Sequence, residues 1–399
     1  MVRHLFRLIW NRKQSNALLL TEIFFSFVVL FGVGTLLLNF GRNYFLPRGF
    51  QHENVWRLNI AAGQGEKMPR HILDEALREV RALPGVLDLS LGSPNTPFRF
   101  ITMNTDFGYG SKEVKNVDRY DADDRYLETM GLTLREGRWF RASDDASTRR
   151  PAVISQTVRE ALFGAGQPAV GKVFRPNSGP GTDSHEEYQV VGVVDNVRTG
   201  GDFSAPEKSA WLRLVPHDTT SWEGASVLVR VAPGQGAALQ QRIVHTVAGV
   251  TRQWSTQVRT LEADRLDKLR ITLAPLAGLA IISAFLIVNV ALGLFGMLWY
   301  NISQRRAEIG LRRAMGATGP NISRQFLGEM LVLTTLGVLA GVLLAAQFPL
   351  LNAFDVEPQV YLMAMLVATG LIFVLAAVCA WQPSRLAAAI QPAAALREE

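Results

Sequence analysis

A short stretch dense in arginine lies between two long apolar runs and offers the clearest place for charge-based recognition. Arg305, Glu308 and Arg312 follow i, i+3, i+7 spacing, so they share one helix face on which the glutamate can pair with either arginine. Gly316 suits a helix C-terminus, and Pro320 suits the first turn of a following helix. The pattern predicts a short basic helix and a tight corner, which is either a docking surface or only a positive anchor for membrane topology.

Catalytic and metal-binding patterns are incomplete in this sequence. Residues 166–173 nearly spell a phosphate-binding loop, but Val173 replaces the Ser or Thr that would bind magnesium. The acidic run 121–124 lacks the turn glycine of a calcium loop, and Leu132 stands at the position of its closing glutamate. The six histidines are scattered without metal-ligand spacing. We therefore expect no catalytic residue, no metal site and no cofactor bound by this chain.

The composition places part of the chain in lipid and part in water. The mean hydropathy is +0.12, with 48% hydrophobic and 19% charged residues. The formal net charge of +6 is concentrated in short segments beside the apolar runs, which indicates membrane topology and not binding of nucleic acid. Cys379 is the one cysteine, so an intrachain disulfide is excluded and the cysteine count does not reveal the compartment.

Four apolar runs are long enough to be transmembrane helices. At about 1.5 Å per residue the first would measure roughly 33 Å, which is enough to cross a bilayer. It also follows a basic start, as a signal peptide would, but it is longer than a signal core and no clean cleavage site follows. We expect spans at 17–38, 271–300, 326–346 and 360–381.

Lysine and arginine are distributed as the positive-inside rule requires for four spans. Segments 1–16, 301–325 and 382–399 carry basic residues, whereas 347–359 carries none. We therefore predict a multi-pass protein with a cytoplasmic N-terminus (1–16), a cytoplasmic segment 301–325 and a cytoplasmic tail (382–399). The long region 39–270 and the short loop 347–359 are then extracytoplasmic.

The region 39–270 has mixed helix and strand patterns, typical of an α+β domain. Residues 68–83 and 237–250 have helical apolar spacing, whereas 188–194 and 227–231 are rich in β-prone residues. We expect a stalk at 261–270 to lead into the second span, where Pro275 would begin or bend the helix.

A few polar or small residues within the spans are candidates for a functional or packing role. Glu22 is either a carboxylate near the interface or part of a translocation path, and Asn289 is expected to bond across helices. Glu329, one turn into the third span, is expected to bond the basic loop. Gly337 and Gly341 form a GxxxG pattern that allows close helix packing, and a dimer face is the sharper hypothesis.

The ten residues 308–317, EIGLRRAMGA, closely resemble the signature between the second and third transmembrane helices of MacB/FtsX-type ABC transporter permeases. In that family this cytoplasmic segment contacts the partner ATPase and carries its stroke into the membrane. Residues 305–307 read Arg-Arg-Ala where relatives often carry Arg-Thr-Arg, a departure that concerns individual charge contacts. The resemblance implies ATPase coupling by Arg305, Arg306, Glu308, Ile309, Gly310, Arg312, Arg313, Gly316 and Ala317.

Further motifs extend the resemblance over nearly the whole chain. Gly137-Arg138 before an acidic turn, Leu162-Phe163-Gly164 with a following Gly-Lys, and the run 190–194 resemble the extracytoplasmic domain of MacB-type permeases. The residues from 383 to 397 resemble the family's C-terminal ending. The implied fold is four transmembrane helices plus a large two-lobed α+β extracytoplasmic domain between helices 1 and 2.

The resemblance also implies a function and its partners. The chain would be the permease subunit of an ABC transporter that acts by mechanotransmission, with ATP and Mg²⁺ on a separate ATPase chain. It would export a peptide, drug or similar substrate from the bacterial cytoplasmic membrane as a dimer with a second copy or a paralogue, with a periplasmic adaptor as a further partner. The alternatives are an FtsX-like regulator of an extracytoplasmic cell-wall hydrolase and a permease that extracts lipoproteins.

Overall fold

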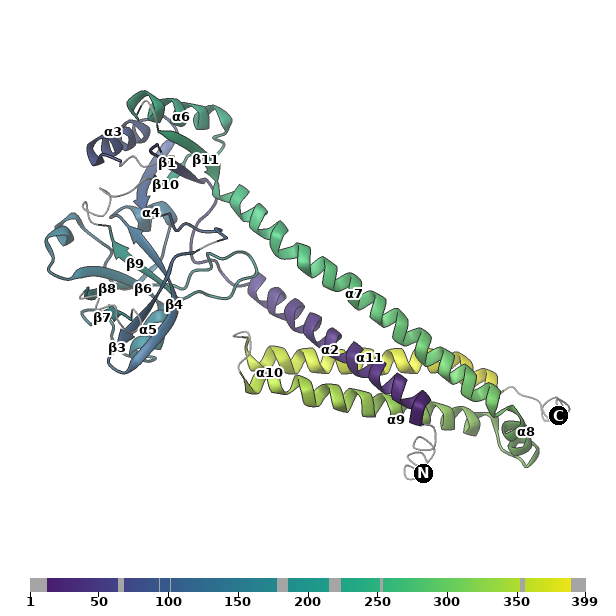
Figure 1. Cartoon of the computed structure of the whole chain (residues 1–399). Coiled ribbons are helices and arrows are strands. Elements are labelled where there is room, and N and C mark those ends of the chain that lie inside the picture. Colours follow the sequence, from purple (N-terminus) through teal and green to yellow (C-terminus); the bar gives the residue numbers. More distant parts are fainter. Residues whose placement is uncertain are drawn as a thin grey trace. The chain divides into compact units, whose positions relative to one another are not determined.

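The structure is a computed structural model of the whole chain (Figure 1). It describes residues 13–63, 68–92, 94–100, 102–177, 186–214, 224–251, 254–351 and 356–388. The basic residues predicted before position 13, residues 352–355 of the short loop and the tail beyond 388 lie outside the described residues. The chain divides into two compact units, Asn43–Thr272 and the remainder, and each is described by itself.

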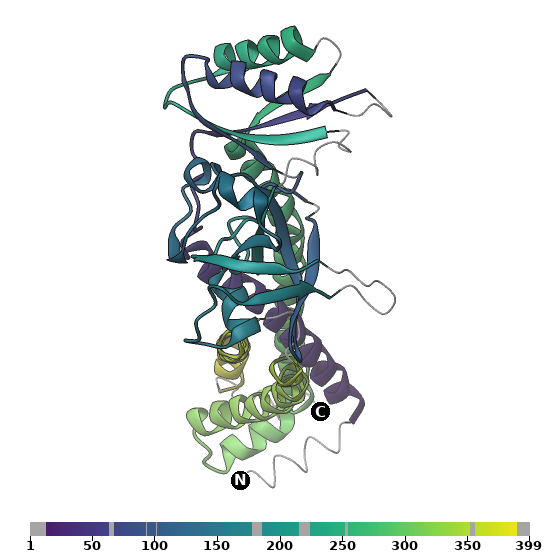
Figure 2. The same ribbon diagram turned by 90° about the vertical axis from the view of Figure 1, so that its left-hand side faces the viewer.

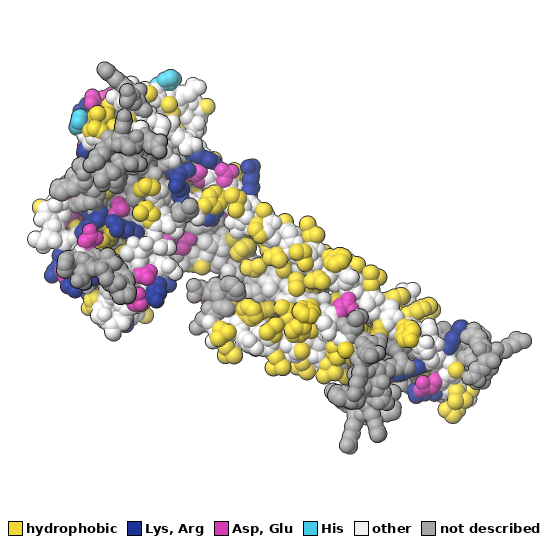
Figure 3. Space-filling model, viewed as in Figure 1, with side chains coloured by type: hydrophobic (Ala, Val, Ile, Leu, Met, Phe, Trp, Pro, Cys, Tyr) yellow, Lys and Arg dark blue, Asp and Glu magenta, His cyan; other side chains and the backbone are white. Residues whose placement is uncertain are grey.

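The helical unit contains four helices that are long and apolar enough to cross a membrane, as the sequence predicts. Large apolar side chains remain exposed along them, for example Ile281 (71%) and Leu366 (70%), as expected for surfaces that face lipid (Figure 3). A chain of buried residues that includes Ile23, Phe27 and Tyr361 fills the interior. The helices of this unit are α2 (Lys13–Tyr44), α7 (Leu261–Gln304), α8 (Arg306–Ala314), α9 (Gly319–Ala345), α10 (Gln347–Leu350) and α11 (Pro358–Ala388). The last two residues of α2 and residues 261–272 of α7 belong to the outer unit.

Helix α7 contains both the predicted stalk, residues 261–270, and the predicted second span. It is one helix of 44 residues with Pro275 inside it, so the proline does not begin the helix. The start is set earlier by local signals: the Thr260 hydroxyl accepts a hydrogen bond from the Ala263 amide at 3.1 Å. Glu262 and Asp264 in the first turn complement the positive end of the helix dipole.

Two polar residues of the spans are held in ways that the sequence did not reveal. Asn289 donates to the carbonyl of Phe285 in its own helix at 2.9 Å, and its predicted bond to another helix stays a prediction. A short amide satisfies itself on the preceding turn when no partner is in reach. The Glu22 carboxylate lies against Gly293 of α7, where a Cβ atom would come within 2.5 Å of its Oε2.

The outer unit, Asn43–Thr272, is built on one mixed sheet with the strand order β11-β1-β10-β2-β4-β3-β7-β8-β6-β9, and β5 pairs with β8 (Figures 1 and 2). The strands are β1 (Val55–Ala61), β2 (Val86–Gly92), β3 (Asn104–Tyr109), β4 (Lys112–Ala122), β5 (Leu134–Gly137), β6 (Arg150–Ser155), β7 (Val173–Pro176), β8 (Tyr188–Val194), β9 (Ser209–Arg213), β10 (Gly224–Val231) and β11 (Ser255–Thr260). The helices are α3 (Arg70–Arg81), α4 (Tyr126–Met130), α5 (Gln156–Phe163) and α6 (Ala237–Thr251), with a 3₁₀ turn at Ala142–Ala146.

The sheet is narrow in the middle, which divides the unit into two lobes. Strands β2 and β4 pair only at Gly92 and Ala122. On one side of this link α3 and α6 lie next to each other over β1, β10 and β2 (Figure 2), and the lobe encloses its own apolar core. On the other side α5 packs on strands whose buried residues, such as Phe107, Ile154 and Val193, form a second core. The predicted α+β domain between the first two membrane helices is confirmed.

Candidate functional site

The corner after α7 has the form that the arginine-rich stretch predicts. Helix α8 is short because Gly316 takes a left-handed conformation (φ 99°) and the Ala317 amide bonds back to the Arg312 carbonyl at 2.9 Å. Pro320 lies in the first turn of α9. On its inner side α8 inserts Ile309, only 3% exposed, into the apolar core of the helical unit. The corner is therefore packed onto the membrane helices.

A chain of polar contacts locks α8 to its neighbours. Arg312 donates to Glu308 at 2.5 Å and to Gln325 of α9 at 2.8 Å. Gln325 in turn donates to Glu329 at 3.2 Å, and Arg305 forms an ion pair with Glu329 at 3.1 Å. Glu308 therefore pairs with Arg312 and not with Arg305, and Glu329 bonds the basic segment as predicted. Because these four contacts share partners, they join the end of α7, the helix α8 and the start of α9 into one connected corner.

The outward face of α8 combines charge with exposed apolar groups. Leu311 is 51% and Met315 is 73% exposed, next to the half-exposed pair of Glu308 and Arg312. Figure 3 shows acidic and basic side chains gathered at this end of the helical unit. Arginine and methionine are typical of protein interfaces, so this face is suited to a protein partner. Among the other predicted coupling residues, Gly310 is buried, Arg306 and Gly316 are exposed, Ala317 is half-buried, and Arg313 is part of α8.

The GxxxG pair of α9 packs against α2 of the same chain. A Cβ atom on Gly337 would lie 2.7 Å from Ile23 Cγ2, and one on Gly341 would lie 2.3 Å from Phe27 Cδ1. Both glycines are buried. The close helix packing predicted for them thus occurs within the chain, and α2 covers the face on which the sequence suggested a dimer contact.

The outer unit holds the first turns of α7 through a buried ion pair that the sequence analysis did not identify. Arg57 of β1 binds Asp264 at 2.8 Å, and their side chains are only 7% and 9% exposed. Arg259 contacts the other carboxylate oxygen of Asp264 at 3.1 Å. Burial lowers the pKa of Arg57, whereas the charge of Asp264 opposes that shift. The start of α7 is therefore fixed to the strand at the centre of the first lobe.

A second buried carboxylate joins the segment after α2 to α7. Asp202 is 2% exposed at its side chain and binds Arg48 at 2.9 Å and Arg265 of α7 at 2.5 Å. Arg265 also binds Glu262, and this hydrogen bond is the largest cause that raises the pKa of Arg265. The loop that carries Asp202 therefore links both points at which the chain passes between its two units.

Arg198 of the same loop is buried among backbone carbonyls. It donates to the carbonyls of Asn43 at 2.6 Å, of Asp202 at 2.9 Å and of Pro47 at 3.1 Å, and also to that of Leu46. Asn43 belongs to the last turn of α2, where a cation is favoured by the negative end of the helix dipole. Arg198 therefore caps α2 and fixes the path of the chain after it.

One carboxyl group of the outer unit gives a pH-dependent prediction. Burial, followed by the charge of Glu207, raises the pKa of Asp118 to about 6, and a hydrogen bond from Thr102 offsets only part of the shift. Because the raised pKa belongs to the folded state, the fold favours the protonated carboxyl of Asp118. The resulting stabilisation is complete below about pH 3.8 and is lost as the pH rises through about 6. We expect Asp118→Asn to raise the free energy of unfolding by about 1 kcal/mol at neutral pH, after allowing for partial exposure.

The check is to compare the thermal unfolding of the native chain and the Asp118→Asn variant, with tryptophan fluorescence as the signal. The increase in stability from Asp118→Asn should be larger at about pH 7.5 than at about pH 5, since a smaller fraction of Asp118 is ionised in the native chain at the lower pH. An equal gain at both pH values would show that the pKa of Asp118 is not raised.

Within the described ranges, no group of three or more His, Cys, Asp or Glu side chains is placed to hold a metal ion. The acidic residues singled out by the sequence are engaged in structure instead. Asp123 accepts from the Ser90 hydroxyl at 2.7 Å and the Leu91 amide at 2.9 Å. Asp121 pairs with Arg150 at 2.9 Å. Asp123 therefore connects the end of β4 to β2, and Asp121 connects β4 to β6.

Two family descriptions match the chain and together cover most of it. The MacB-like periplasmic core domain matches residues 24–246, and the FtsX-like permease C-terminal domain matches residues 280–392. The first match contains Asp202 and its partner Arg48, and the second contains α8 and both glycines of the GxxxG pair.

Curated relatives are similar over long stretches. The macrolide export ATP-binding/permease protein MacB 1/2 of Paracoccus denitrificans is 29% identical over 57% of this chain and 33% of that protein. The pyoverdine export ATP-binding/permease protein PvdT of Pseudomonas syringae pv. tomato is 26% identical over 98% of this chain and 58% of that protein. This chain thus spans less than two thirds of the length of either relative.

Among solved structures, the periplasmic region of MacB from Actinobacillus actinomycetemcomitans matches 56% of this chain and 95% of that one. The sequence identity is 14% and the TM-score is 0.38.

Proposed function

Because this chain belongs to the MacB-like, FtsX-like family of ABC transporter permeases, we propose that it couples ATP hydrolysis by a partner ATPase to movement of its extracytoplasmic domain. The observation that supports this most directly is the corner at α8. Its polar contacts bind it to α7 and α9, while Leu311, Met315 and the Glu308–Arg312 pair face outward. The ATPase would bind ATP and Mg²⁺, and this chain would be a non-catalytic subunit.

The continuous helix α7 supports transmission by a lever. At about 1.5 Å per residue, 44 residues measure roughly 66 Å, more than the bilayer core. Its outer turns are ion-paired to the first lobe through Asp264, and its inner end meets the corner through Arg305 and Glu329. A continuous helix with ion pairs near both ends would pass on a displacement that a flexible linker would absorb.

We propose export as the task, since the relatives bear the names of macrolide and pyoverdine exporters. The chain would act in a bacterial cytoplasmic membrane as a dimer with a second copy or a paralogue. Both termini would lie in the cytoplasm, and a periplasmic adaptor would receive the cargo. A regulator of a cell-wall hydrolase would show the same ATP-driven motion without any flux of cargo.

The test is a distance measurement between outer domains during the ATPase cycle. Cys379→Ser gives a cysteine-free chain, and Leu87→Cys, at a side chain 61% exposed, places one spin label on each outer domain. In lipid nanodiscs with the cognate ATPase, ATP plus vanadate should shift the label–label distance by about 5 Å or more. Samples without the ATPase are the control. Unchanged distances in the vanadate-trapped complex would refute mechanotransmission.

A further inference from the structure

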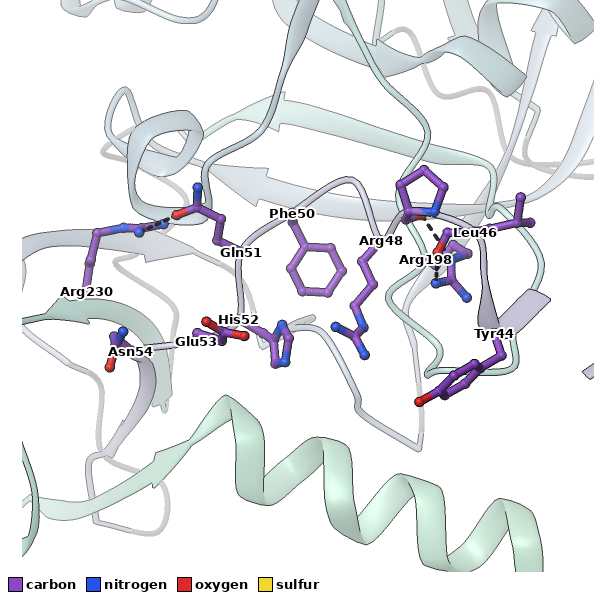
Figure 4. A pocket seen from close by; sticks show the side chains of 11 residues that line it. Tyr44, Leu46, Arg48, Phe50, Gln51, His52, Glu53, Asn54, Arg198 and Arg230 are labelled. Carbon is purple, nitrogen blue, oxygen red and sulfur yellow. Dashed lines mark hydrogen bonds between the residues drawn. The ribbon is translucent and has the colours of Figure 1, made fainter. Parts of the chain in front are cut away.

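A cavity of about 700 Å³ opens in the outer unit beside the segment that follows α2 (Figure 4). It is lined by Tyr44, by residues 46–48 and 50–54, and by Arg198 and Arg230. This volume lies within the range of small-molecule sites, which is about 300–1,000 Å³. The cavity is separate from the ATPase-facing corner, and the proposed coupling role does not use it.

The charges that line this cavity favour an anion. Arg48, Arg198 and Arg230 stand against one acidic lining residue, Glu53. Burial lowers the pKa of His52, and the charge of Arg48 adds to that shift, so the histidine adds no cation at neutral pH. The positive charge of the cavity therefore comes from the three guanidinium groups.

Two of these arginines donate their hydrogen bonds to neutral groups in the part of the chain that the structure describes. Arg230 donates to Gln51 Oε1 at 2.6 Å and to the Thr129 carbonyl at 2.9 Å, and Arg198 donates to carbonyl groups. Arg48 pairs with Asp202, but that carboxylate is shared with Arg265. Carbonyls satisfy the N–H groups without cancelling the charge, and a buried charge is costly without a counterion. The charges of Asp202 and Glu207 offset part of the charge of Arg198, and that of Asp88 offsets part of the charge of Arg230, but none of these three carboxylates lines the cavity.

The position of this cavity along the chain relates it to the lipid surface. The first span, Leu19–Tyr44, has 26 residues, or about 39 Å of helix, close to the roughly 40–45 Å of a bilayer with its headgroups. Tyr44, which lines the cavity, is the last residue of this candidate span and therefore lies toward a membrane surface. Tyr44 is 53% and Phe45 is 84% exposed, as expected for aromatic residues of the interfacial belt.

We propose that this cavity binds the phosphate of an anionic phospholipid headgroup, with Arg48 and Arg230 as the contacting groups. Arg198 adds charge while it holds the carbonyls that shape the wall. Figure 4 shows Arg48 directed into the space beside Phe50 and His52, and Arg230 held in place by Gln51. Guanidinium groups match phosphate in geometry and charge. A soluble phosphate has the same chemistry, so the test has to separate the two sources.

The test measures lipid retained by the full chain. The protein is purified from nanodiscs that contain phosphatidylglycerol and phosphatidylcholine, and the bound lipid is quantified by mass spectrometry. Arg48→Gln with Arg230→Gln should lower the affinity for phosphatidylglycerol about 10-fold or more, as expected for the loss of charged hydrogen bonds. Arg48→Lys with Arg230→Lys should keep part of it, since the charge remains.

Arg135→Gln with Arg175→Gln is the matched control, because these side chains are 62% and 67% exposed and lie outside the lining. It removes the same charge and should leave lipid binding unchanged. Glycerol 3-phosphate added to delipidated protein in detergent should bind far more weakly than the lipid. Equal lipid retention by the Arg48/Arg230 variant and native protein, or equally tight binding of glycerol 3-phosphate, would overturn the proposal. Thermal midpoints confirm that each variant is folded.

Discussion

Reversing the pair on the outward face of α8, Glu308→Lys with Arg312→Glu, should abolish the complex with the partner ATPase while the corner stays folded. The two side chains are at i, i+4 and 2.5 Å apart, so the exchanged pair can form again within the helix. A partner surface that is complementary to this face would meet each charge with its like. Such mismatches cost several kcal/mol, which corresponds to an affinity loss of 100-fold or more.

The measurement is co-purification of the ATPase with the detergent-solubilised chain, supported by the ATPase rate in nanodiscs. The matched control is Arg70→Asp with Asp74→Arg, because this exposed pair of α3 has the same i, i+4 spacing and a 2.8 Å contact. It lies in the outer unit and should leave the complex intact. If the α8 variant still captured the ATPase as the native chain does, this face would not be the docking surface.

The exchange also tests the part of the network that is internal to the chain. Arg312 donates to Gln325, and a glutamate at position 312 would lose that contact. The ion pair of Arg305 and Glu329 remains, with side chains 13% and 12% exposed, and Ile309 stays in the core. We therefore expect normal insertion and at most a small decrease in the thermal midpoint.

Local sequence signals were sufficient for the form of this corner. A glycine that permits a left-handed backbone and a proline without an amide hydrogen fix where helices end and begin, whatever surrounds them. The four spans were predictable for a similar reason, because bilayer thickness sets the length of an apolar helix. The partner of Arg305 was only partly predictable: Glu329 was expected to bond the loop, but spacing alone favoured Glu308.

The ion pairs that hold the start of α7 in the outer unit were not predictable, because they join residues far apart in the sequence. Arg57 and Asp264 are separated by 207 positions, and no periodic pattern relates them. Arg198 is harder still, since its acceptors are backbone carbonyls, which every residue has. The GxxxG pattern correctly indicated close packing, but the sequence does not say whether the second helix belongs to the same chain.

Asp264→Asn should weaken the outer unit more than any other substitution of a charged residue considered above. It would leave Arg57, with a side chain 7% exposed, as a buried charge without its counterion. Breaking a buried pair in this way costs about 3–5 kcal/mol. For a unit of this size that corresponds to a decrease in the thermal midpoint of roughly 6–20 °C. Fluorescence-detected unfolding of the full chain would measure it.

Two comparisons identify the cause of this loss. Asp267→Asn removes a carboxylate from the same face of α7, but its side chain is 42% exposed, so it should cost less than about 1 kcal/mol. Arg57→Met with Asp264→Leu removes both charges and should recover most of the stability, since an apolar pair of similar size replaces a buried ion pair well. A double variant as unstable as Asp264→Asn would mean that lost packing, and not the unpaired charge, explains the effect.

The same variants separate docking from transmission. Asp264 lies in the outer unit, so Asp264→Asn should still capture the ATPase through α8 and allow ATP hydrolysis. With the Arg57–Asp264 pair between β1 and α7 lost, movement of the helix would displace the first lobe less, and the ATP-dependent change in distance between outer domains should decrease. The α8 reversal should lose the complex itself. If Asp264→Asn and the Arg57/Asp264 double variant both kept the full change in distance, α7 would transmit force to the outer unit by contacts other than this ion pair.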